Sequence, residues 1–180
     1  MPDPVPERAR IESAVLVPLY RDGAGALRLV VIRRAPGGIH GGQLGFPGGK
    51  PEPGDASPFA TALREAEEEI GLPHSAVTRL ADLPAVFTQA TGYNIDPFLA
   101  RIVRPPRWRL DPREVDEVLE PSLDELARPE AHGESLERLP RSDEPVRIAF
   151  YRIGPHRLWG ASYRILHPLL PRLRAGEWAL

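Results

Sequence analysis

Apolar and polar residues follow one another along this chain in a pattern that predicts several β-strands. Short runs rich in Val, Ile, Leu, Phe and Tyr, bounded by Gly, Pro and Asp, are typical of strands. Such runs cover residues 11–20, 27–33, 77–87, 93–103, 114–119 and 146–153. Asp22-Gly23-Ala24-Gly25 predicts a turn between the first two strands, and Thr91-Gly92 separates the third strand from the fourth.

Residues 58–70 follow a helical period instead. Ser57 can cap this helix with Pro58 in its first turn, and Gly71 followed by Pro73 ends it. At about 100° per residue, the apolar side chains fall on one stripe that would hold the helix to a core. The stripe consists of Phe59, Ala62, Leu63, Ala66 and Ile70.

The C-terminal third predicts two more helices and a polar connection. Ser122 can cap a short helix over residues 123–128, and residues 129–145 are polar and loop-like. Residues 161–174 form an amphipathic helix that Pro168 is expected to kink or break. Strands combined with two or three helices predict an α/β (α+β) fold, with a mixed sheet covered by helices on both faces.

Length and composition narrow the class of protein. The 180 residues favour one domain, which we expect over residues 10–180 after a loosely ordered proline-rich segment at residues 1–9. A net charge of −2 gives no electrostatic case for nucleic-acid binding. Without cysteine there is no disulfide or thiolate site, and no apolar run reaches the roughly 18 residues of a membrane helix. We expect a soluble, cytoplasmic protein, compatible with a homodimer.

Three glutamates share one edge of the predicted helix over residues 58–70. Glu65, Glu68 and Glu69 fall within an arc of roughly 100°, beside the apolar stripe. Like charges four residues apart oppose helix formation by roughly 0.2–0.5 kcal/mol per pair, and Arg64 can neutralise only part of them. A divalent cation could offset the repulsion, although the helix taken alone favours an ordinary solvated acidic face.

The glycine-rich segment before this helix favours the metal interpretation. Residues 35–54 hold eight glycines, and a long glycine loop in a compact domain is usually functional. Gly48-Gly49 allows backbone atoms to approach a ligand that a Cβ atom would obstruct.

Loop and helix together resemble the Nudix box, Gly-x5-Glu-x7-Arg-Glu-(aliphatic)-x-Glu-Glu-x-Gly-(aliphatic). The matching residues are Gly49, Arg64-Glu65, Glu68-Glu69 and Gly71-Leu72. Asp55 stands where the loop glutamate belongs, eight residues rather than seven separate it from Arg64, and Ala66 is smaller than the usual aliphatic residue. The extra residue lies in the loop, so the spacing of the glutamates is unchanged. The resemblance implies a Nudix-like α-β-α sandwich.

The same resemblance implies a metal-dependent hydrolase of nucleoside diphosphate derivatives. Mg²⁺ or Mn²⁺ would be held by Glu65, Glu68 and Glu69, with the Gly49 carbonyl as a further ligand. Arg64 would orient the glutamates. Glu65 and Glu114 are the two candidates for the general base, which completes a catalytic set of Arg64, Glu65, Glu68 and Glu114.

The residues before the box resemble the coenzyme A pyrophosphatase group of the Nudix family. The likeness consists of the strand ending at Arg33, then His40-Gly41-Gly42-Gln43-Leu44-Gly45-Phe46-Pro47-Gly48-Gly49, and later Thr91-Gly92-Tyr93 and Trp159-Gly160. Departures lie at residues 34–36 and 160–162. The resemblance implies a coenzyme A-like substrate, cut to 3′,5′-ADP and 4′-phosphopantetheine, with Arg33, His40, Gln43 and Gly48 as substrate-binding candidates.

Each assignment has an alternative. Arg33 could pair with a carboxylate, His40 and Gln43 could only satisfy loop backbone groups, and Asp55 could hold Arg64. The arginine cluster at residues 101–113 around Trp108 is either a phosphate-binding and adenine-stacking loop or, as we favour, a solvated one.

Two other functions stay open. The substrate could be ADP-ribose, a dinucleoside polyphosphate or a nucleoside triphosphate, or the protein could bind nucleotides on a Nudix fold without catalysis. The intact Arg64-Glu65 and Glu68-Glu69 pattern argues against the latter, because binding alone does not need three clustered carboxylates. Walker A, nucleophile-elbow and His-Glu-x-x-His motifs are missing from the sequence.

Overall fold

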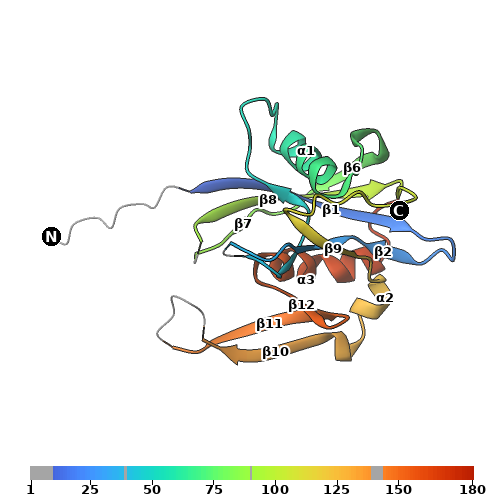
Figure 1. Ribbon diagram of the computed structural model, residues 1–180. Helices are drawn as coiled ribbons and strands as arrows, with labels where there is room; N and C mark the ends of the chain where they lie inside the picture. Colours follow the sequence, from blue (N-terminus) through green and yellow to red (C-terminus); the bar gives the residue numbers. More distant parts are fainter. Residues whose placement is uncertain (1–9, 39, 90, 139–143) are drawn as a thin grey trace.

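The computed structural model describes residues 10–38, 40–89, 91–138 and 144–180 (Figure 1). The expected N-terminal lead-in at residues 1–9 lies outside them. Strand β1 (Ile11–Arg21) runs through the centre of the main sheet, parallel to β8 (Tyr93–Ile102). The other strands of this sheet are β2 (Leu27–Leu29) and β5 (Gly48–Gly49), both antiparallel to β1, and β6 (Val77–Asp82) and β7 (Val86–Phe87), both antiparallel to β8. The mixed sheet of the sequence prediction is confirmed.

Two smaller antiparallel sheets flank the main one. The first has the order β4 (Leu44–Gly45), β3 (Val31–Arg34), β9 (Val115–Leu119), and the second has the order β10 (His132–Glu137), β11 (Val146–Ile153), β12 (His156–Trp159). The helices are α1 (Pro58–Ile70), α2 (Leu123–Leu126) and α3 (Gly160–Arg174), with single 3₁₀ turns η1 (His74–Ala76) and η2 (Pro129–Ala131). None of the helices in the described residues is long and apolar enough to cross a membrane.

The two faces of β1 build two hydrophobic clusters, because successive side chains of a strand point to opposite sides. Val15, Val17 and Leu19 belong to the cluster that also contains the apolar residues of α3. Ala14 and Leu16 belong to the cluster that contains Ala62, Ala66 and Ile70 of α1. The sheet therefore lies between α1 and α3, the α-β-α order visible in Figure 1. Because both clusters share one strand, we propose that residues 10–180 form a single domain.

Several elements differ from the prediction for identifiable reasons. The run at 27–33 divides at Val30, where the chain leaves the main sheet and enters the sheet of β3. The run at 77–87 divides around Pro84, which has no N–H to continue a ladder. Helix α3 continues unbroken through Pro168 and Pro171, because apolar side chains on both sides of Pro168 are buried in one core cluster.

The expectation of a loop over residues 129–145 is wrong for its first part, which holds η2 and β10. Strand β10 pairs with β11 from His132 opposite Tyr151 to Glu137 opposite Val146. Its own residues are mostly polar, so the strand depends on a distant partner that a local pattern does not reveal. Strand β12 was not predicted either. Residues 139–143 of the expected loop lie outside the described part of the chain.

Candidate active site

Helix α1 begins and ends where its capping residues predict. The Ser57 hydroxyl accepts a hydrogen bond from the Ala60 N–H at 3.1 Å, and Gly71 closes the helix in the left-handed conformation at φ 68°. Ala62 and Ala66 pack toward β1 with no exposed surface. This contact fixes the rotation of the helix, so that Glu65 and Glu69, one turn apart, lie beside β5.

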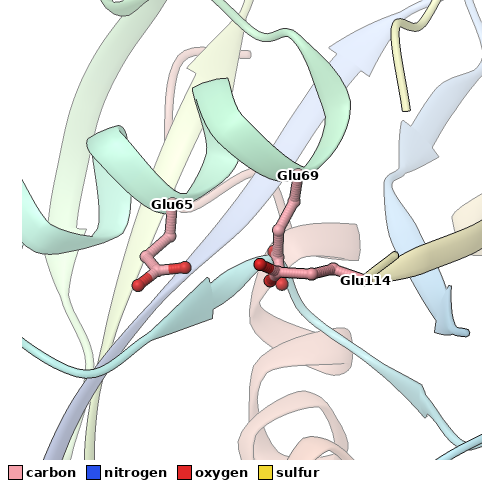
Figure 2. A group of neighbouring side chains, drawn as sticks. All are labelled: Glu65, Glu69 and Glu114. Atoms are coloured by element: carbon pink, nitrogen blue, oxygen red, sulfur yellow. The ribbon is translucent and has the colours of Figure 1, made fainter. Parts of the chain in front are cut away.

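Three carboxylates meet at this place. Oxygen atoms of Glu65, Glu69 and Glu114 all lie within 4.8 Å of one another. Figure 2 shows Glu65 and Glu69 descending from α1, while Glu114 reaches the same space from the chain just before β9. Three negative charges at this separation repel one another strongly unless protons or a cation compensate them.

Glu69 is the buried member of the three, with 1% of its surface exposed. Its Oε2 atom accepts a hydrogen bond from the Gly48 N–H at 2.9 Å, while Oε1 has no hydrogen-bond partner among the described residues. The Arg34 guanidinium lies 3.5 Å from Oε1 as an ion pair. Burial raises the pKa of Glu69 to about 8, and the nearby Glu65 and Glu114 carboxylates add to this effect. A buried carboxylate oxygen without a hydrogen bond is one that a bound cation would satisfy.

Glu65 lies in a cradle formed by Gly49. A Cβ atom on Gly49 would stand 2.4 Å from Glu65 Oε1, so only glycine leaves room for this carboxylate. The Gly49 carbonyl accepts a hydrogen bond from the Ser13 hydroxyl at 2.9 Å. Burial raises the pKa of Glu65, whereas the Arg64 guanidinium, 3.1 Å away, lowers it. The three clustered carboxylates form an all-oxygen donor set, which fits Mg²⁺ or Mn²⁺.

Arg64 connects the helix to the loop before it. Its Nε and Nη2 atoms donate to the Asp55 carboxylate, and Nη2 also donates to the Lys50 carbonyl at 2.9 Å. Asp55 further accepts a hydrogen bond from the Thr61 hydroxyl, and its bonds to Arg64 hold the pKa of its carboxyl well below the usual range. Asp55 therefore anchors Arg64 and the loop, which is the alternative role that the sequence left open for it.

Glu68 is not part of the carboxylate cluster. Its side chain is 56% exposed, and its Oε2 atom accepts a hydrogen bond from Arg64 Nη1 at 3.0 Å. Glu68 lies one residue from Glu69 and therefore about 100° around the helix, which is enough to move it from the buried side to the solvent.

The substrate-binding candidates differ in how they relate to the carboxylates. Arg33 pairs with Asp116 and Glu117 of β9, and His40 Nδ1 lies 3.2 Å from Gln43 Oε1 within the loop before β4. Gly48, by contrast, is part of the site through its N–H on Glu69.

Arg34 is the arginine beside the carboxylates, and sequence reasoning missed it. Its Nη2 atom also donates to the Gly48 carbonyl at 3.4 Å. Residues 33 and 34 of a strand point to opposite faces. Two consecutive arginines in a strand before the box therefore indicate that one of them faces the site. Only the pairing of β3 with its neighbours shows that this residue is Arg34.

The aromatic ring of Trp108 is covered on one side by Arg104, whose guanidinium carbon lies 5.4 Å from the ring centre. Arg107 and Arg109 of the same loop are exposed.

The pKa of Glu69 predicts how pH acts on the metal-free protein. Between its ordinary value of 4.5 and about 8, the folded state retains a proton that the unfolded chain has released. The free energy of unfolding should therefore fall as pH rises through this range, by at most about 1.4 kcal/mol per pH unit. Thermal unfolding in EDTA from pH 5 to 8.5 measures this slope. The substitution Glu69→Gln should remove the part of the slope that comes from Glu69. Identical slopes in both proteins would contradict the buried, protonated Glu69.

Comparison with known proteins connects this geometry to a family. The sequence model of the NUDIX domain matches residues 10–141. A protein of Photorhabdus laumondii subsp. laumondii described as "Uncharacterized Nudix hydrolase NudL" is 35% identical over 165 residues, covering 90% of this chain and 84% of the relative. A protein of the same description from Escherichia coli K12 is 37% identical over 157 residues, covering 84% and 72%. The solved structure of a Nudix hydrolase from M. smegmatis, RenU, shares the fold with a TM-score of 0.63 at 20% identity, covering 95% of this chain and 89% of that one.

Proposed function

The chain belongs to the Nudix family, and from this premise we propose that it hydrolyses the diphosphate bond of coenzyme A or its derivatives. The family makes it a pyrophosphohydrolase of nucleoside diphosphate derivatives. The observation that carries the chemistry is the cluster of Glu65, Glu69 and Glu114, in which one buried Glu69 oxygen has no hydrogen bond. Coenzyme A as the substrate rests on the likeness of residues 33–49 to the coenzyme A pyrophosphatase group.

Glu65, Glu69 and the Gly49 carbonyl would hold Mg²⁺ or Mn²⁺. When bound, such an ion neutralises charge on a diphosphate and lowers the pKa of a coordinated water. The resemblance to the Nudix box implies Glu68 as a further ligand. Glu68 would have to break its hydrogen bond to Arg64 to reach the metal. Arg64 would keep Glu65 in place through its own bonds to Asp55 and the Lys50 carbonyl.

We assign Glu114 as the general base. Glu69 is bound to the Gly48 N–H and Glu65 lies against Arg64, whereas no hydrogen bond or ion pair engages the Glu114 carboxylate among the described residues. Its free oxygen can accept a proton from the attacking water. Water oxygen bonds to one phosphorus atom, the P–O–P bridge breaks, and the proton passes finally to the departing phosphate. The products of coenzyme A would be 3′,5′-ADP and 4′-phosphopantetheine.

Substrate preference tests the assignment. Coenzyme A carries a ribose 3′-phosphate that dephospho-coenzyme A lacks, and a charge-assisted hydrogen bond contributes roughly 1.5–3 kcal/mol. We expect kcat/KM to be about 10- to 150-fold higher for coenzyme A than for dephospho-coenzyme A. Initial rates with Mg²⁺ and with Mn²⁺, compared with ADP-ribose and dinucleoside polyphosphates, measure this preference. A better rate on dephospho-coenzyme A or ADP-ribose would remove coenzyme A and leave the family chemistry.

Two companion measurements sharpen that test. Arg33→Ala should reduce the rate on coenzyme A much more than on dephospho-coenzyme A if Arg33 leaves Asp116 and Glu117 to bind the 3′-phosphate. In ¹⁸O-labelled water a single attack should label one product phosphate only. Tight binding of coenzyme A without product at any divalent metal would favour the non-catalytic binding protein.

A further inference from the structure

The loop at residues 103–114 carries Glu114 from the end of β8 to the start of β9. The side chain of Glu114 makes no hydrogen bond or ion pair with the described residues, so the backbone of this loop sets its position. Arg104, just after β8, pairs with Glu120, just after β9, so the start of the loop is tied to the far end of the strand that follows it. Arg104 Nε donates to Glu120 Oε1 at 2.6 Å, and Nη2 donates to Oε2 at 2.9 Å. A bidentate pair of this kind fixes both distance and orientation.

Further contacts hold this pair. The Tyr20 hydroxyl of β1 donates to Glu120 Oε1 at 2.8 Å. The Arg104 guanidinium carbon lies 5.9 Å from the centre of the Tyr20 ring and 5.4 Å from the centre of the Trp108 ring. The Arg104 and Glu120 side chains are 32% and 21% exposed, so solvent screens their ion pair less than it screens a surface pair. We call Arg104, Glu120 and Tyr20 the loop clasp.

The far end of the loop is attached to the catalytic helix itself. The Arg109 N–H donates to the Ile70 carbonyl and the Asp111 N–H donates to the Glu69 carbonyl, both at 3.1 Å. The Asp111 carbonyl then accepts the N–H groups of Glu114 and Val115 at 3.0 and 2.8 Å. Glu114 is therefore separated from the backbone of Glu69 by one hydrogen-bonded turn.

We propose that the loop clasp is a positioning device for catalysis, which holds the loop against α1 and thereby keeps Glu114 beside Glu65 and Glu69. This inference rests on the proposed function, because it concerns the base assigned there. The clasp touches Glu114 nowhere and acts on it through the chain, since Arg104 lies at the opposite end of the loop and Glu120 at the opposite end of β9. A cleft of about 600 Å³, lined in part by all three clasp residues, borders the clasp. Arg104 thus lies at the surface, over two rings at the edge of the cluster packed on α1.

Arg79 offers a matched control for the loss of Arg104. It donates from Nε and Nη2 to the two Asp82 oxygens at 2.7 and 2.6 Å, and it lies over the rings of Phe59 and Phe98 at 4.9 and 5.0 Å. The Arg79 pair thus repeats the chemistry of the clasp on β6, where its partners all lie outside the loop that carries Glu114.

The test combines kinetics in a double-mutant cycle with hydrogen exchange. Arg104→Gln should lower kcat about 10-fold with KM within 2-fold, because a misplaced base affects the chemical step. Glu114→Gln should lower kcat about 100-fold, and adding Arg104→Gln to it should cost nothing further. In the metal-free protein, amides of residues 105–114 should exchange faster in Arg104→Gln than in wild type. Arg79→Gln should change none of these quantities.

Separate outcomes identify which assignment fails. Full activity of Glu114→Gln would remove Glu114 as the base and leave the hydrogen-exchange effect to report on the clasp alone. If Glu114→Gln is impaired, an equal further loss from Arg104→Gln in that background, or unchanged exchange in the loop, would overturn the clasp. Should Arg104→Gln not fold, Tyr20→Phe replaces it, since this change removes only the hydroxyl bound to Glu120. Tyr20→Phe should then show the same non-additivity with Glu114→Gln and the same faster exchange of the loop amides, each as a smaller effect.

Discussion

Glu69→Gln is expected to lower kcat by about 10³-fold or more while the protein remains folded. The change keeps the size of the side chain and an oxygen that can accept the Gly48 N–H, but it removes a negative charge from a buried position. A charged ligand that stabilises developing phosphoryl charge in a site shielded from water contributes several kcal/mol to the transition state. Steady-state kinetics with Mg²⁺ or Mn²⁺, together with thermal unfolding, measures both parts of this expectation.

Metal binding gives an independent readout of the same substitution. Titration with Mn²⁺ should show much weaker binding to Glu69→Gln than to wild type, because the variant lacks a charged oxygen ligand. Full activity in Glu69→Gln, or undiminished wild-type activity in EDTA, would rule out the proposed metal site.

Glu68→Gln is the matched comparison, because it makes the same change one residue away on the same helix. In the structure the Glu68 carboxylate is exposed and bound to Arg64, so we expect a loss smaller than that of Glu69→Gln. An equal loss would mean that Glu68 leaves Arg64 and enters the site when the metal binds.

Local signals explain why helix α1 could be predicted from the sequence. Its N-cap, its proline in the first turn and the left-handed glycine at its end all act within a few residues. The same helical period placed Glu65 and Glu69 on one edge. It also placed Glu68 within that arc, and the period alone does not show that the packing of α1 on β1 buries the Glu69 end of the arc and leaves the Glu68 end, about 100° away, in solvent.

Contacts between distant segments explain what the sequence could not show. Glu114 reaches the site because β9 pairs with β3, and the register shift at Arg33 and Arg34 sets Arg34 opposite Val115. The faces of β3 decide that Arg34, rather than Arg33, lies beside Glu69. None of these relations leaves a periodic signal near the residues concerned, so Glu114 could be named only as one of two candidates for the base.

Gly48 and Gly49 are adjacent in β5, yet substitution by alanine should affect different properties. Gly48→Ala should lower stability, and Gly49→Ala should lower activity. Gly48 has φ 152°, and a Cβ there would lie 2.2 Å from the backbone oxygen of Ala14, which cannot move without distorting β1. Strain of this kind costs about 3 kcal/mol or more. Gly48→Ala should therefore lower Tm by about 10 °C, since 1 kcal/mol corresponds to roughly 2–4 °C in a domain of this size.

Gly49→Ala should instead lower kcat by 100-fold or more with Tm within about 2 °C of wild type. The added Cβ would meet the carboxylate end of the Glu65 side chain, which can rotate away at little cost in stability but then leaves the site. Gly54→Ala, in the loop that follows β5 and with no atom within 4 Å of the added Cβ, should change neither quantity. Loss of stability without loss of kcat in Gly49→Ala would show that Gly49 supports the fold rather than the position of Glu65.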